Sequence, residues 1–114
     1  MMPKFDEACK TIEDFTKSSF YNEHRNKTSE SLENHARRIQ KPNIDNFYDF
    51  PSKFMIAAAL NYLKDENQEK FSACLRNAYN MKKETPYQEN INALKVLLEH
   101  TDKAYNSLRK KIIH

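Results

Sequence analysis

The side chains that could hold a metal ion are the four histidines of the chain, His24, His35, His100 and His114. Zinc and di-iron sites use ligands one helical turn apart, in patterns such as HxxxH, HExxH or Glu-x-x-His. None of these spacings occurs in the sequence. His24 and His35 would share a face of one continuous helix, but we expect that helix to break between them. We therefore predict histidines on solvated polar faces, with no metal and no other cofactor.

Nucleophilic or acid–base catalysis would need a thiol beside a histidine or a pair of carboxylates with a partner. Cys9 and Cys74 both fall on the apolar face of an amphipathic pattern, which is typical of a thiol that packs as a small hydrophobic group. Asp45 and Asp49 form the obvious close pair of acids, but no basic residue or histidine is near them in the sequence. We predict that the protein is not an enzyme.

The composition excludes a further set of functions. Average usage would give this chain about 8 glycines, yet its 114 residues include none. The phosphate loop, the dinucleotide-binding fingerprint and the nucleophile elbow all need glycine, so these motifs are absent. The two cysteines are not in a CxxC pattern, and the charged N-terminus has no apolar run of signal-peptide length. We expect reduced thiols, a cytoplasmic location and, from the many Asn and Lys residues, a bacterial source.

Hydrophobic spacing predicts helices through the first third of the chain. The first helix buries residues three and four apart and ends or bends near 18–22. A second helix is capped by Thr28 or Ser29 and ends before Pro42. Its apolar face consists of Leu32, Ala36 and Ile39.

The middle of the chain predicts a helical hairpin. Ser52 can cap a helix over 53–64, which is apolar nearly all round and should be the buried centre of the fold. A short turn follows, and then a helix whose apolar face consists of Phe71, Cys74, Leu75, Ala78 and Tyr79.

The C-terminal part predicts one long helix. Thr85 and Pro86 give a strong start signal, and a heptad seam then runs from Tyr87 to Ile112 with Thr101 as its polar member. Such a helix would have roughly 26 residues and span about 39 Å. We expect its distal end to form a homodimer interface unless the N-terminal helix covers it; the interface residues are Tyr105, Leu108 and Ile112.

The segment 41–51, KPNIDNFYDFP, is the one long loop that the sequence predicts. It holds large apolar side chains and two acids, a combination that protein interfaces use. The alternative is a loop folded onto the bundle with its Phe side chains in the core. As a partner-binding surface, its residues would be Ile44, Asp45, Phe47, Tyr48, Asp49 and Phe50.

Basic residues gather in three groups, at 37–41, 82–83 and 109–111. Each group falls in the last turn of a predicted helix, where cations complement the helix dipole. The net charge of +3 is modest for a protein that binds nucleic acid. DNA binding through these helix ends is therefore the second interpretation of the sequence.

Together these patterns predict one domain over 1–114, an all-α irregular antiparallel bundle of about five helices with a long C-terminal helix. The favoured function is a non-catalytic protein-interaction module, a small regulator or inhibitor that binds a partner enzyme. A DNA-binding regulator is the first alternative, and an adaptor or secretion chaperone is the second. No membrane span is expected, because the longest apolar stretch is only 54–60.

Overall fold

The computed structural model describes residues 3–39, 50–83, 85 and 90–113. These residues form seven helices and contain no β-strand, so the predicted all-α class is confirmed. The helices are α1 (Pro3–Phe15), α2 (Ser19–His24), α3 (Ser29–Ile39), α4 (Phe50–Lys64), α5 (Gln68–Lys83), α6 (Ile91–Glu99) and α7 (Thr101–Ile112). None of them is both long enough and apolar enough to cross a bilayer.

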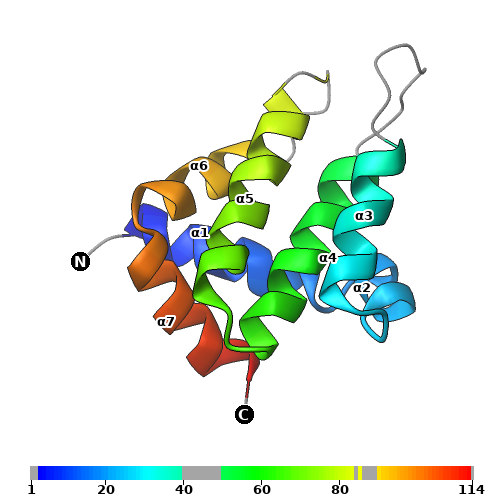
Figure 1. Ribbon diagram of the computed structural model, residues 1–114. Helices are drawn as coiled ribbons and strands as arrows, with labels where there is room; N and C mark the ends of the chain where they lie inside the picture. The colour runs from blue at the N-terminus through cyan, green and yellow to red at the C-terminus, as the bar shows by residue number, and fades with distance from the viewer. Residues whose placement is uncertain (1–2, 40–49, 84, 86–89, 114) are drawn as a thin grey trace.

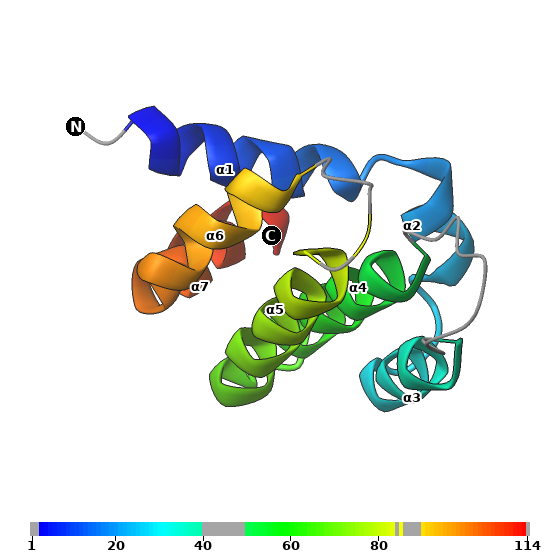
Figure 2. The same ribbon diagram turned by 90° about the horizontal axis from the view of Figure 1, so that it is seen from above.

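Helices α3, α4 and α5 stand side by side and alternate in direction (Figure 1). Helix α6 packs against both α5 and α1, and α7 continues along the same side of the molecule. Seen from above, α1 crosses the bundle on the side away from α3 (Figure 2). The predicted irregular antiparallel bundle is therefore the observed architecture.

Helix α4 is the buried centre of this arrangement, as its sequence predicts. The ten consecutive residues 54–63 are all buried. Met55, Ala58 and Leu63 point in different directions around the helix, and none of them has any exposed surface. The helix begins at Phe50, two residues before the expected cap Ser52. Pro51 lies in the first turn, where its missing N–H removes no helical hydrogen bond, and this lets the helix start earlier.

The predicted break after the first helix is present, but it takes the form of a turn followed by a short helix. Helix α1 ends at Phe15, and the Ser18 side chain caps α2 by accepting a hydrogen bond from the Tyr21 N–H at 3.2 Å. Thr28 caps α3 in the same way, because its Oγ1 accepts from the Ser31 N–H at 3.1 Å. The sequence does not predict α2, since six residues are too few to show a periodic face.

The predicted single C-terminal helix is wrong: α6 and α7 are separated at His100, whose backbone is not helical (φ −139°, ψ 52°). The His100 N–H closes α6 onto the Leu97 carbonyl, and the His100 carbonyl accepts the first hydrogen bond of α7 from Ala104. The change in direction lets α7 pack against α1, α5 and α4. A straight helix of about 39 Å would carry its distal half away from these helices.

Candidate functional site

The predicted partner-binding loop is described only at its last residues. Five of the six residues predicted for this surface lie outside the described residues; they are Ile44, Asp45, Phe47, Tyr48 and Asp49. Phe50 begins α4 with half of its surface (50%) exposed, and it is the exposed large hydrophobic residue among those that the structure describes. This exposed aromatic ring at a helix start, beside the loop that the sequence singles out, is the candidate site.

The Phe20 ring of α2 packs on Phe50. The Phe20 ring stacks on it with centroids 6.1 Å apart, and Phe20 also meets the edge of Phe54 at 4.9 Å. The Lys53 ammonium lies 5.9 Å from the centroids of both Phe20 and Phe50, which is the range of cation–π attraction. We call these residues, together with His24 and His35, the Phe50 cluster.

Two histidines that the sequence analysis places on solvated faces belong to this cluster. The rings of His24 and His35 contact Phe54, with centroids 4.8 Å and 4.4 Å from it. Burial lowers the pKa of His35, and the nearby cations Arg38 and Lys27 lower it further. His24 has a buried Nδ1 without a hydrogen-bond partner in the described part of the chain. The expectation of solvated histidines is wrong for this pair, because α2 and α3 both fold back onto the start of α4.

The two cysteines lie in the core, as predicted. Cys9 and Cys74 are both buried free thiols. Burial raises the pKa of Cys74 to about 12, and it raises the pKa of Cys9 as well. A thiol with so high a pKa has almost no thiolate at neutral pH, so neither side chain is an activated nucleophile.

A buried carboxylate network between α3, α4 and α5 has no counterpart in the sequence analysis. Glu33 accepts hydrogen bonds from the Tyr62 hydroxyl and from Arg37, each at 2.9 Å, and the Lys70 ammonium lies 3.9 Å away. Burial acts to raise the pKa of Glu33, but these donors outweigh it and the net pKa is lowered. Burial raises the pKa of Tyr62, and the hydrogen bond that its hydroxyl donates to Glu33 raises it further. The network joins three helices, and the i, i+4 spacing of Glu33 and Arg37 is its only signal in the sequence.

The residues predicted for a dimer interface are largely inside the single chain. Leu108 has no exposed surface, and Ile112 is half-buried. Tyr105 is 5% exposed, and its ring packs on the Phe71 ring with centroids 5.6 Å apart. Helices α1 and α5 thus cover this face of α7 within the single chain, which the sequence left undecided. Tyr105 and Leu108 are not available as the centre of an interface, and a homodimer stays a prediction without them.

The basic groups do lie at helix ends, and protein contacts engage several of them. Arg37 pairs with Glu33, Arg109 pairs with Glu66, and Lys82 is buried. Lys83 lies over the Tyr79 ring at 5.9 Å. These contacts explain much of the basic pattern as internal structure.

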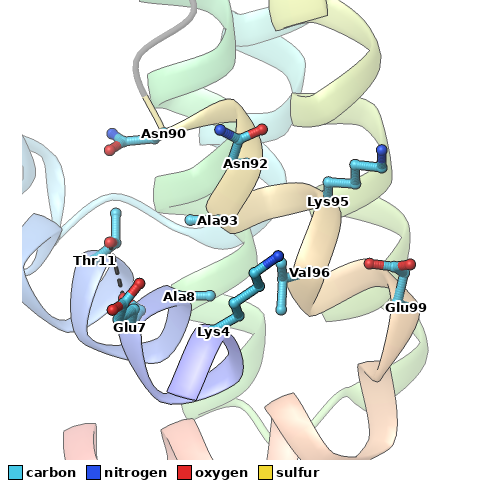
Figure 3. A pocket seen from close by; sticks show the side chains of 10 residues that line it. All are labelled: Lys4, Glu7, Ala8, Thr11, Asn90, Asn92, Ala93, Lys95, Val96 and Glu99. Carbon is cyan, nitrogen blue, oxygen red and sulfur yellow. Dashed lines mark hydrogen bonds between the residues drawn. The ribbon is translucent and has the colours of Figure 1, made fainter. Parts of the chain in front are cut away.

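A polar cleft of about 650 Å³ lies between α1 and α6 (Figure 3). Its rim carries both charge signs, with Lys4 and Lys95 against Glu7 and Glu99. The Thr11 hydroxyl is turned to its own helix and donates to the Glu7 carbonyl at 2.9 Å. The remaining lining residues are Ala8, Asn90, Asn92, Ala93 and Val96. A lining of mixed charges and small apolar side chains favours no particular ligand chemistry.

Within the described ranges, no three His, Cys, Asp or Glu side chains gather as metal ligands would. Comparison of the chain with protein-family models, with curated protein sequences and with solved structures finds no match.

Proposed function

We propose that this protein is a non-catalytic interaction module of the cytoplasm that binds a partner enzyme and regulates or inhibits it, with Phe50 as an anchor. The observation that carries the proposal is the half-exposed Phe50 ring, held by Phe20 and Lys53 on the surface of a packed bundle. Aromatic anchors of this kind contribute most of the binding energy in many protein interfaces.

The size of the anchor supports the proposal. A Phe side chain offers about 200 Å² of surface, so burying the exposed half against a partner would contribute about 2.5 kcal/mol. The ring contacts with Phe20 and the start of α4 restrict Phe50 before binding, which reduces the entropy lost on association. Lys53 beside the ring would favour a partner that presents a carboxylate next to an apolar pocket.

The test is capture with matched variants. Wild-type protein, Phe50→Ala and the control Tyr79→Ala, which removes a half-buried ring on α5, would be used to capture proteins from lysate, with identification by mass spectrometry. We expect a partner that wild type and Tyr79→Ala retain and Phe50→Ala loses. Titration of that partner's activity then separates a regulator from an adaptor or a secretion chaperone, which would leave the activity unchanged. Equal capture by Phe50→Ala would refute the anchor.

A DNA-binding regulator is the second candidate, supported by the cations at the end of α7. Lys110 and Lys111 lie in its last turn, next to Arg109. Binding of this kind would be electrostatic, so the logarithm of the affinity should fall linearly with the logarithm of the salt concentration. Gel-shift measurements with two unrelated duplexes at several salt concentrations test it, and sequence-selective binding at physiological salt would place this function first.

A further inference from the structure

A second cleft, of about 380 Å³, lies where several helices end. Four of its lining residues are cations, and each comes from a different segment of the chain: Lys17 follows α1, Arg25 caps α2, Lys64 ends α4 and Lys111 lies in the last turn of α7. The other lining residues are Glu13, Thr16, Tyr21 and Ile112. Residues distant in the sequence thus bring positive charge to one place.

These four cations have no carboxylate partner within 4 Å in the part of the chain that the structure describes. Lys64 lies over the Tyr21 ring at 5.3 Å, and Arg25 donates a long 3.5 Å hydrogen bond to Asn22. Arg37 and Arg109 elsewhere in the molecule do have carboxylate partners. No ion pair among the described residues therefore compensates the charge of these four side chains.

Helix dipoles account for part of this pattern. A helix C-terminus carries about half a negative charge, so the four helix ends here would offset about two of the positive charges. Glu13 offsets another. A surplus of about one positive charge is left in a concave site, where low-dielectric walls concentrate the field and attract anions.

The backbone that carries two of the cations, Arg25 and Lys64, is fixed before any ligand arrives. The buried Asn61 side chain donates to the Arg25 carbonyl at 3.3 Å and to the Lys27 carbonyl at 2.8 Å, and it accepts from the Tyr21 hydroxyl at 3.1 Å. Asn61 thereby ties the end of α2 to the last turn of α4, which carries Lys64. The distance between Arg25 and Lys64 is held by the fold.

We propose that this cleft binds the phosphate group of a small ligand. Ammonium and guanidinium groups that converge from several sides match the oxygens of a phosphate, which accept hydrogen bonds in several directions. The volume lies within the range of small-molecule sites. The four cations line a single cleft, whereas a nucleic-acid backbone needs a line of contacts along its length. Tyr21 and Ile112 supply apolar surface for the uncharged part of the ligand.

This site is separate from the Phe50 anchor. Phe50 and Lys64 are the first and last residues of α4, and at 1.5 Å per residue they lie about 21 Å apart. The anion site therefore does not depend on the proposed function, and the two can be tested independently.

The test is calorimetric titration with pyrophosphate and with inorganic phosphate. We expect saturable one-to-one binding that Lys64→Gln and Lys111→Gln each weaken tenfold or more. Lys110→Gln is the matched control, since Lys110 is the neighbour of Lys111 but does not line this cleft, and we expect it to bind within twofold of wild type. Glu13→Gln removes the acid that lines the cleft among the described residues, and it should tighten binding. Circular dichroism would confirm that each variant is folded.

Three results would overturn the proposal. Absence of saturable pyrophosphate binding to the folded wild type is the first. Equal weakening in Lys110→Gln is the second, because it would show a general charge effect. The third is tighter binding of a short single-stranded oligonucleotide or of polyglutamate with the same dependence on Lys64 and Lys111, which would assign the cleft to a macromolecular polyanion.

Discussion

At the scale of single residues, the polar groups that matter most in this protein are the buried ones. Glu33, Tyr62 and Asn61 each satisfy their hydrogen bonds across helices, and these bonds fix how α3 and the end of α2 lie on α4. A buried polar group that loses its partner is costly, so such contacts specify one arrangement of helices over others that would bury the same apolar area.

The Tyr62 hydroxyl can be removed without changing the shape of the core. We expect Tyr62→Phe to lower the free energy of unfolding by about 2 kcal/mol, because the hydroxyl donates to a charged carboxylate. The pKa of Glu33 is lowered in the folded state, so its contribution is present above the unfolded pKa and is lost as the pH falls through the folded pKa. Urea denaturation at neutral pH and again in acid measures both effects. Tyr79→Phe is the control and should change neither, and an unchanged stability in Tyr62→Phe would show that the hydrogen bond contributes nothing.

His35 predicts a second pH dependence, in a higher range. Its pKa is lowered from the usual 6.5, so the folded protein favours the neutral imidazole. The contribution to stability is present above the unfolded pKa of about 6.5 and is lost as the pH falls below it. We expect the melting temperature to fall between about pH 7.5 and pH 5.5. His35→Gln should remove most of this fall, whereas a fall of the same size in the variant would assign it to another group.

At the scale of the elements, a chain without glycine has to make its tight turns with other residues. Between α4 and α5 the Asn67 N–H donates to the Tyr62 carbonyl at 2.9 Å, which is the 6→1 hydrogen bond of a Schellman motif. This motif places Glu66 in the left-handed region at φ 59°. A residue with a Cβ pays about 1 kcal/mol or more for that conformation.

Glycine at this turn should therefore stabilise the hairpin. We expect Glu66→Gly to unfold with a free energy about 1 kcal/mol higher than Glu66→Ala. The comparison with alanine is needed because Glu66 also pairs with Arg109, and both variants lose that exposed pair equally. Thermal and urea denaturation of the two variants measure the difference. A glycine variant that is no more stable than the alanine variant would show that the turn is not strained.

At the scale of the whole molecule, the fold closes on itself along the seam of α6 and α7. Leu94, Leu97 and Leu108 have no exposed surface in the single chain. The break at His100 is what allows this closure, because it turns α7 onto α1 and α5. The Phe50 cluster and the cleft lined by Lys64 and Lys111, here called the basic cleft, lie at opposite ends of α4. The protein partner and the anion that we propose would therefore bind at separate places.

Leu108 separates a closed monomer from a dimer. We expect Leu108→Asp to unfold the protein, since a buried leucine lost to alanine already costs 2–5 kcal/mol and an unpaired buried charge costs more. That loss is a large share of the total stability of about 5–15 kcal/mol. Lys110→Asp on the exposed side of α7 is the control and should stay folded. Circular dichroism with light scattering measures both, and a folded Leu108→Asp of smaller mass would instead establish the dimer interface.

The sequence alone determines the helical class, the buried position of α4 and the burial of the two cysteines. Each follows from local periodicity, because the spacing of apolar residues reports which face of a helix avoids water. Phe50 is one of the six residues named from the sequence in segment 41–51, because that segment combines large apolar side chains with two acids.

Only the tertiary structure decides where helices change direction and which distant side chains meet. The three- and four-residue steps of the C-terminal seam continue in phase through Thr101, so periodicity cannot register the break at His100. The meeting of His24 with His35 at Phe54 depends on how α2 and α3 pack on α4. The four cations of the basic cleft likewise come from four helix ends. A hydrophobic pattern specifies that a face is covered, whereas the partner that covers it is chosen by packing between segments far apart in the chain.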